Sequence, residues 1–300
     1  IGALMPVLAK DEKETGQLFE AIGPLWDGNE VWLLVAGGSL FAAFPQVYAT
    51  VFSGFYLPVM AIIFALIFRA VSFEFYALDK ENRKIWRNAF MVGSLLPSLL
   101  FGIALGNVIL GIPMDYDWNF SGNILLVFRP FALVVGILGL VAIIMQGSTF
   151  TLIKTSGPVY KRARFIAEKF WILYCSLVGL ALVATIFYRS HFLAKPVPWI
   201  FTSLVVGSLF AIKYFLKKNN DVAVFLSSSV AFMSLWGIAG SVLYPNLVPA
   251  TKESGFNLTL NNASSSALTL QVMLIIALIG MPLVIIYSVY TYKLFKGKVS

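Results

Sequence analysis

Eight long apolar runs divide the chain and exclude most other folds. They cover residues 29–45, 49–76, 86–110, 124–150, 168–189, 197–216, 221–245 and 267–294. A helix needs about 20 apolar residues to cross a membrane, and lipid cannot bond to free backbone groups, so spans must be helical. We therefore predict an all-α polytopic membrane helix bundle of eight spans, with residues 1–300 as a single transmembrane domain.

The composition agrees with this class of protein. Hydrophobic residues make up 59% of the chain and charged residues only 12%, far from the averages of soluble proteins. The formal net charge of +8 could suggest a nucleic-acid partner. The basic residues, however, lie in short clusters between apolar runs, which is the pattern that orients a membrane protein. We expect no nucleic-acid partner.

The basic residues predict the orientation of the chain. One set of alternate connections holds 17 of the 22 lysines and arginines. These are Lys10, Lys13, Lys80, Arg83, Lys84, Arg87, Lys154, Lys161, Arg162, Arg164, Lys169, Lys213, Lys217, Lys218, Lys293, Lys296 and Lys298. The opposite connections hold only Arg129, Arg189, Lys195 and Lys252, while Arg69 lies within a span. Because basic loops stay inside, we expect cytoplasmic segments at about 1–28, 77–86, 151–168, 214–221 and 293–300, and a cytoplasmic C-terminus.

The N-terminal part of the pattern is irregular. The first apolar run is short for a full span and ends in a Phe44-Pro45-Gln46 sequence that predicts a tight corner. The chain opens with the apolar segment 1–6, which resembles the end of an earlier apolar helix. We expect a further N-terminal segment to precede it.

Histidine and cysteine are too scarce for a metal centre. The chain has one cysteine, Cys175, and one histidine, His191. A haem held by two histidines, or a zinc site of clustered ligands, cannot be built from this pair. We predict no metal site in this chain, so that any redox metal must be held mainly by a partner.

The stretch Trp26-Asp27-Gly28-Asn29-Glu30-Val31-Trp32 places two acids at the start of the first apolar run. Acids in such a position are costly and often functional. Asp27 and Glu30 are three residues apart, so they share a face of a helix. Two interpretations remain for Asp27: a helix N-cap or, with Glu30, a proton relay on the cytoplasmic side.

Arg69 and Glu74 are the charged residues of the second apolar run. That run is antiparallel to the first, so its inner end returns towards the two acids. We expect the Arg69 head group to approach Glu30 or Asp27, directly or through water; the alternative is that Arg69 reaches the inner surface. Glu74, between Phe73 and Phe75, is either a further proton-path candidate or a solvated helix end.

Small and amide residues in the runs predict helix contacts. Gly37 and Gly38 would let another helix approach closely. Asn107, Arg129 and Gln146 lie near span ends, where interhelical hydrogen bonds are expected.

The motifs together resemble a known family. The match begins at 26–33, continues through 36–45 and 52–56, and includes Leu66-Ile67-Phe68-Arg69 and Phe73-Glu74-Phe75. It recurs in order at 86–87, 93–97, 102–107, 111–113, 130–133, 146–149, 244–245, 262–265 and 268–270. The sequence closely resembles subunit II of the cytochrome bd-type quinol oxidases over nearly its whole length.

The resemblance implies a function and a set of partners. The family has nine spans, so the first would be missing here. It forms a bacterial or archaeal plasma-membrane complex of the respiratory chain, which oxidises quinol and reduces dioxygen to water without pumping protons. Two b-type haems and one d-type haem are expected on the partner, subunit I, in a heterodimer. The resemblance also admits a bound quinone and small accessory subunits.

The resemblance also assigns candidate residues. The family's motif aspartate lies in a proton path from the cytoplasm, and Asp27 occupies that position. Glu30, Arg69 and Glu74 are the further candidates; Trp26, Asn29 and Trp32 support the motif.

Two other hypotheses remain open. The first is a stand-alone secondary transporter with Asp27, Glu30 and Arg69 as coupling groups, although the sequence shows no inverted repeat. The second is a purely structural partner in which the acids are inert.

Overall fold

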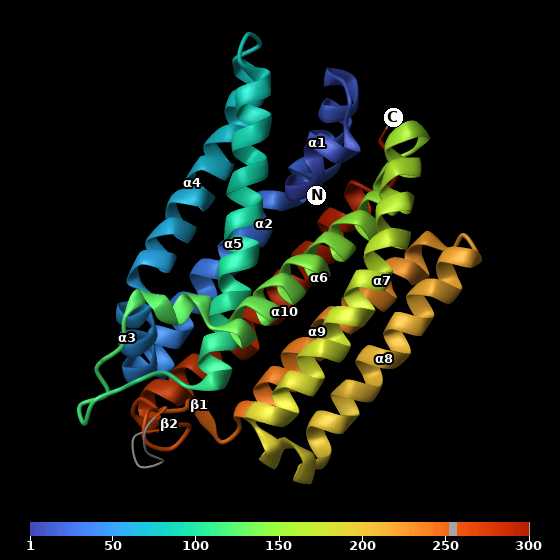
Figure 1. The fold of residues 1–300 in the computed structure, drawn as a ribbon. Helices are drawn as coiled ribbons and strands as arrows, with labels where there is room; N and C mark the ends of the chain where they lie inside the picture. Colours follow the sequence, from blue (N-terminus) through green and yellow to red (C-terminus); the bar gives the residue numbers. More distant parts are fainter. Residues whose placement is uncertain (252–256, 300) are drawn as a thin grey trace.

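The computed structural model describes residues 1–251 and 257–299, apart from the side chains of His191 and Phe192. Lys252 lies outside these residues. The elements, in chain order, are η1 (Gly2–Leu4), α1 (Met5–Leu8), α2 (Glu12–Ala43), α3 (Pro45–Gly54), α4 (Tyr56–Leu78), α5 (Arg83–Leu110), η2 (Ile124–Phe128), α6 (Pro130–Lys154), α7 (Gly157–Tyr188), η3 (Ser190–Ala194), α8 (Pro196–Lys217), α9 (Asp221–Leu243), β1 (Asn246–Val248), β2 (Leu258–Thr259) and α10 (Ala267–Leu294). The predicted all-α class is confirmed (Figure 1).

The number of spans differs from the predicted eight. Within the described residues, seven helices are long and apolar enough to cross a membrane: α4 to α10. The first predicted run, 29–45, forms the second half of α2, which is not among the seven. Asp27, just before that run, and Glu30, within it, lower the hydropathy of this part of α2. The eighth span therefore remains unconfirmed.

The predicted corner after the first run is confirmed, and a second break follows it. Helix α2 ends at Ala43, and α3 begins at Pro45, whose fixed φ suits the first position of a helix. The predicted run 49–76 is not one helix, because the chain breaks again at Phe55, between α3 and α4. Hydropathy alone missed this break, since every residue around it is apolar or small.

Several predicted cytoplasmic loops are mostly helical. Helix α2 already begins at Glu12, within the predicted loop 1–28. Helices α6 and α7 extend to Lys154 and from Gly157, so little of the predicted loop 151–168 is irregular. The connections at 79–82 and 218–220 are likewise shorter than predicted. Charged helix ends continue beyond the apolar part of a span, and hydropathy records only that part.

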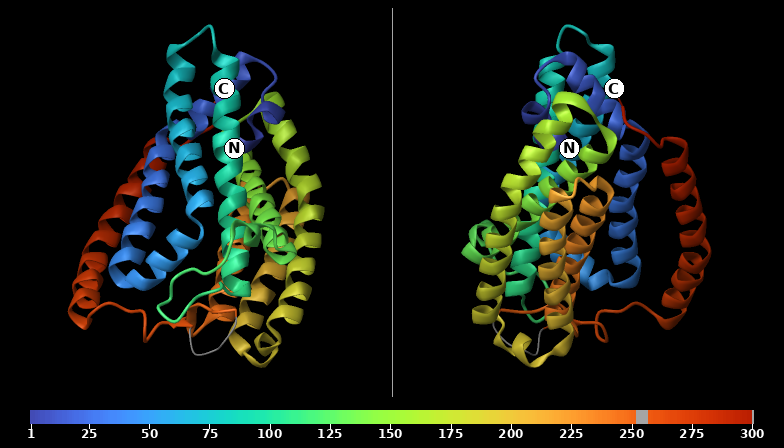
Figure 2. Two further views of the ribbon diagram at one scale, coloured as in Figure 1. Left: turned by 60° about the vertical axis from the view of Figure 1, so that its left-hand side comes forward. Right: turned by 90° about the vertical axis from the view of Figure 1, so that its right-hand side faces the viewer.

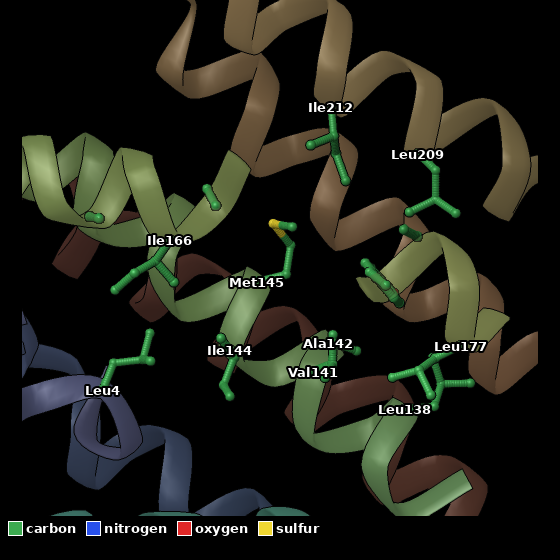
Figure 3. Packing of buried hydrophobic residues seen from close by; sticks show 14 of the residues in the cluster. Leu4, Leu138, Val141, Ala142, Ile144, Met145, Ile166, Leu177, Leu209 and Ile212 are labelled. Atoms are coloured by element: carbon green, nitrogen blue, oxygen red, sulfur yellow. The ribbon is translucent and has the colours of Figure 1, made fainter. Parts of the chain in front are cut away.

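Helix α6 lies at the centre of the bundle and packs against α5, α7 and α9. Half of its most apolar window is buried, the largest share among the seven candidate spans described. Figure 3 shows its buried side chains, including Leu138, Val141 and Met145, facing residues of α7 and α8. By contrast, none of the corresponding window of α10 is buried, and this helix stands apart from the others (Figure 2).

Glycines allow α5 and α6 to pack at very short range. A Cβ atom added at Gly106 would lie 2.6 Å from the Ala132 Cα, and one at Gly102 would lie 2.8 Å from the Gly136 Cα. Small residues at such a crossing let two membrane helices gain van der Waals contact along their backbones. Gly37 and Gly38 do not play this role, since no described atom outside their own helix lies within 4 Å of their Cβ positions.

The basic connections and the C-terminus lie towards one end of the molecule (Figure 1). Arg83 pairs with Glu12 at 2.6 Å, Arg162 with Glu14 at 2.5 Å and Lys298 with Asp221 at 3.8 Å. We call this region the basic end. The hydrogen bond from Arg162 holds the pKa of Glu14 below its usual value, so this pair loses its contribution to stability as the pH falls through that lowered value.

The opposite end carries the two strands and the connection 111–129. Strands β1 and β2 form a short antiparallel pair, with Asn246 opposite Thr259. The Thr50 hydroxyl donates to the Trp118 carbonyl at 2.8 Å, and the Ile112 amide donates to Pro249 at 2.9 Å. These contacts join α3, the long connection and the strands into a small cap.

The α5–α6 crossing gives a test of the fold. We expect Gly106→Ala to lower the stability of the purified protein by about 1–3 kcal/mol, because the new methyl group meets backbone atoms of α6. The matched control is Gly139→Ala, whose Cβ would lie at an ordinary 3.6 Å from Gly102. Alanine has the better helix propensity, so the control should melt at the same or a higher temperature. Equal melting curves for the two variants would contradict the close approach.

Candidate functional site

Helix α2 carries the whole acidic motif on one uninterrupted helix. It is capped at its start by Asp11, whose side chain accepts a hydrogen bond from the Glu14 amide at 2.8 Å. Asp27 lies 15 residues after the first helical residue, Glu12, so the N-cap interpretation of Asp27 is wrong. Its place in the middle of a helix needs another explanation.

Glu30 and Arg69 form the central contact of the site. Arg69 Nη2 lies 4.0 Å from Glu30 Oε2, and the two side chains are 26% and 18% exposed. The expected approach of Arg69 to the motif is thereby confirmed. Arg69 Nε and Glu30 Oε2 are also buried without a hydrogen-bond partner in the described structure. Buried polar atoms of this kind usually bond to ordered water, so this pair is suited to hold one.

The position of Arg69 depends on the packing of α4 against α5. Gly93 of α5 lies so close to α4 that an added Cβ would be 2.6 Å from the Ala65 carbonyl oxygen and 2.9 Å from the Arg69 Cβ. This approach brings the Phe90 ring to 5.9 Å from the Arg69 guanidinium. A cation over an aromatic face is attracted electrostatically, which helps to keep Arg69 inside the bundle.

Aromatic packing fixes the motif against α4. Trp26 stacks on Phe73 with ring centroids 4.6 Å apart. Phe73 in turn packs edge-on against Phe19, at 5.2 Å. Trp32, two residues after Glu30, is 40% exposed and lines a cavity of about 560 Å³ between α2 and α10. The motif tryptophans thus lie on two sides of α2.

Asp27, Asn29 and Glu74 do not join the ion pair. All three are exposed. Neither Asp27 nor Glu74 has an ion-pair partner among the residues that the structure describes. The structure therefore brings together Glu30 and Arg69, and it leaves Asp27 about one helical turn away on an accessible surface of α2.

A cavity of about 370 Å³ extends from Arg69 to α6, the central helix of the bundle. Trp26, Asn29 and Arg69 line one side of it, and Gln146 and Gly147 of α6 line another. Polar groups from α2, α4 and α6 therefore face one space.

Gln146 continues this polar region towards α9. Its side-chain amide donates to the Ser229 hydroxyl at 2.6 Å, and its carbonyl accepts from Ser228. The predicted interhelical hydrogen bond of Gln146 is confirmed. Sequence reasoning missed the two serines, although a run of three serines at 227–229 within an apolar span is an unusual signal.

The other two predicted interhelical contacts had different outcomes. Arg129, at the start of α6, donates to the carbonyl of Gly111 at the end of α5, at 2.8 Å. Asn107 instead donates to the Ile103 carbonyl of its own helix, at 3.0 Å, so the interhelical prediction is wrong for this residue.

Metal ligands do not gather in the part of the chain that the structure describes. No group of three or more histidine, cysteine, aspartate or glutamate side chains there could hold a metal ion.

The helices and the site together define a multi-pass membrane protein with an ion pair and polar side chains between its helices. The sequence matches, over residues 1–295, the family described as cytochrome bd terminal oxidase subunit II. The chain therefore belongs to this family.

Curated relatives match along the whole chain. Cytochrome bd-I ubiquinol oxidase subunit 2 of Escherichia coli (strain K12) is 29% identical, and the match covers 100% of this chain and 89% of the relative. Cytochrome bd ubiquinol oxidase subunit 2 of Bacillus subtilis (strain 168) is 30% identical, with coverage of 100% and 90%. A probable cytochrome oxidase subunit 2 of Haemophilus influenzae is 29% identical.

The ion pair makes a testable prediction. We expect Arg69→Gln and Glu30→Gln each to lower the melting temperature, and the double variant to lower it no further than the worse single one. The coupling free energy should be about 0.5–2 kcal/mol, as for other contacting pairs, and a double-mutant cycle of thermal unfolding measures it.

The control cycle pairs Arg69→Gln with Glu20→Gln. Glu20 is an exposed acid of the same helix, seven residues before Asp27. Here the two effects should add. Additivity in both cycles would mean that Glu30 and Arg69 do not interact.

Proposed function

We propose that this chain is the non-haem subunit of a terminal oxidase that couples the oxidation of quinol to the reduction of dioxygen to water. The observation that carries this proposal is the family match over residues 1–295, together with relatives named as ubiquinol oxidase subunits. The haems, two b-type and one d-type, would be held by subunit I. The single histidine of this chain supports that division.

The exposed helices supply the surface for such a partner. Helix α10 buries none of its most apolar window within its own chain. The second half of α2 is also open, and Leu34 is 77% exposed. Large apolar faces of this kind can be covered by lipid or by another membrane protein. We assign part of them to subunit I, in a heterodimer that small accessory subunits can join.

The acidic motif would provide a route for protons into that complex. Asp27 is accessible and would take up a proton, and Glu30 lies about one turn deeper and would receive it. Arg69, 4.0 Å from Glu30, stabilises the carboxylate, so that the proton is passed on rather than retained. The partnerless polar atoms of this pair suit a water that would link the two acids. Glu74 remains a further candidate on α4.

The direction of this route follows from charge. The basic end would face the cytoplasm of a bacterial or archaeal cell, with the C-terminus inside. Protons for water formation would then come from the cytoplasm, and quinol would release its protons outside. The reaction would thereby separate charge across the membrane without a proton pump.

The alternative is a stand-alone secondary transporter that uses Asp27, Glu30 and Arg69 as coupling groups. Transporters of this kind bind their substrates near the bilayer midplane, at broken helices. The break at Phe55 lies 14 residues before Arg69, which is about 21 Å along α4, so it is not part of the Glu30–Arg69 site. This placement favours the oxidase subunit.

Replacement of Asp27 tests the proton route. We expect Asp27→Asn in the assembled complex to slow quinol-driven oxygen consumption about tenfold or more, because the side chain keeps its size but loses its proton. Proton uptake from the inner side, followed with a pH-sensitive dye in vesicles, should slow in parallel.

The matched control is Glu20→Gln, which removes an exposed acid from the same helix and should leave both rates unchanged. Full turnover and full proton uptake in Asp27→Asn would show that this aspartate is inert and would support the purely structural hypothesis.

Purification tests the class of protein. We expect the chain, extracted in mild detergent, to elute with a larger subunit, and the haem absorption bands to follow that complex. A homogeneous preparation of this chain alone, without haem and with substrate transport in vesicles, would establish the transporter instead.

A further inference from the structure

Lysines without acidic partners gather where α7 and α8 meet the basic end. We call Lys161 of α7 and Lys213 and Lys217 of α8 the α7–α8 lysine face. Lys161 and Lys217 are exposed, and Lys213 is partly buried. None of the three forms an ion pair with any residue that the structure describes. Three lysines without ion-pair partners in the described structure thus lie at the end of two candidate spans.

Two sets of hydrogen bonds fix α7 and α8 side by side at this place. Trp171 Nε1 donates to the Leu209 carbonyl at 2.7 Å. About two turns nearer the basic end, Arg164 donates to the Leu216 carbonyl and to Asn219 Oδ1, each at 2.5 Å. The helices are antiparallel and locked in register, so the lysines have defined neighbours.

Helical spacing puts the lysines on one edge of the pair. Lys213 follows Leu209 by four residues and Lys217 follows Lys213 by four, so they share a face of α8. Ile212 and Leu216, on the inward face of α8, are buried. On α7, Arg164 reaches across to α8. Lys161 lies three residues before Arg164 and shares its face of the helix, so it lies at the same edge of the pair.

The neighbouring acids are already engaged. Glu168 pairs with Arg164 at 3.3 Å. Asp221 accepts a hydrogen bond from the Tyr160 hydroxyl at 3.0 Å and lies 3.8 Å from Lys298. Neither carboxylate forms an ion pair with a lysine of this face.

Lys213 has the most defined surroundings. Its ammonium lies 5.1 Å from the centroid of the Trp171 ring, which the bond to Leu209 holds in place. Ile172 and Phe210, next to this contact, are 58% and 68% exposed. Tryptophan is enriched at the boundary between lipid headgroups and hydrocarbon. The surroundings of Lys213, a fixed tryptophan and exposed apolar side chains, are typical of that boundary.

We propose that the α7–α8 lysine face binds the phosphodiester headgroup of an anionic phospholipid. Lys213 contacts the phosphate from below, and Lys217 and Lys161 contact it from the aqueous side. The acyl chains lie along Ile172 and Phe210. Basic sites between transmembrane helices recognise such headgroups. A free phosphate ion would use the lysines but would gain nothing from the exposed apolar residues.

The test uses the assembled complex in nanodiscs that mix phosphatidylcholine with a minor fraction of phosphatidylglycerol. Bound lipid is counted by native mass spectrometry. We expect the double variant Lys213→Gln/Lys217→Gln to bind phosphatidylglycerol about 30-fold more weakly than the unchanged complex, since the two lysines together contribute about 2 kcal/mol of attraction.

The matched control is Lys84→Gln. Lys84 is also an exposed lysine at the basic end and has no ion-pair partner among the described residues. It lies on α5, however, and not on the α7–α8 pair. Its loss should leave the bound lipid unchanged.

Three results would overturn the proposal. Equal retention of phosphatidylglycerol in the double variant and the unchanged complex would show that the lysine face is not a lipid site. An equal loss in the Lys84 control would show that the effect is one of general surface charge. If added inorganic phosphate displaces phosphatidylglycerol from the unchanged complex, the face is a phosphate-ion site and not a lipid site. The single variant Lys213→Glu, which inverts the charge at an edge position, repeats the test should the double variant fail to assemble.

Discussion

Backbone groups within a bilayer can bond only to one another, and the structure of this chain depends on that constraint. It makes helices obligatory, and it confines irregular backbone to places where protein surrounds it. The corner at Phe44 and the break at Phe55 lie at the cap end, where the long connection and the strands cover them. Small residues at the α5–α6 crossing then let helix backbones touch, which replaces the hydrophobic force that lipid cannot supply.

Charge within the bundle is the second determinant. Arg69 and Glu30 are tolerated because each partly satisfies the other, and because Phe90 and the aromatic packing around Trp26 hold them in place. Asp27 has no such partner in the described chain, and it is the more accessible acid. Glu30 is therefore the more enclosed acid of the motif, held beside Arg69, and Asp27 is the acid in contact with the surroundings of α2.

The sequence predicted the class of fold and the approach of Arg69 to Glu30, since hydropathy, loop charge and antiparallel order determine both. It did not predict the break at Phe55, because apolar residues surround that position on both sides. It also misplaced the start of α2, since the polar first half of that helix resembles a loop. It did not predict the serines that bond to Gln146, because three serines lower the hydropathy of an otherwise apolar span only slightly.

Helix α10 is held at its two ends rather than along its length. At one end, the Ser265 amide donates to Ala43 at 2.8 Å. At the other, Lys154 donates to the Phe295 carbonyl at 2.6 Å, and Gln17 donates to the Val299 carbonyl at 2.7 Å. Residues 295–299 follow all seven candidate spans that the structure describes. The bonds from Lys154 and Gln17 therefore act as a clasp on α10 that cannot close before these seven helices have been synthesised.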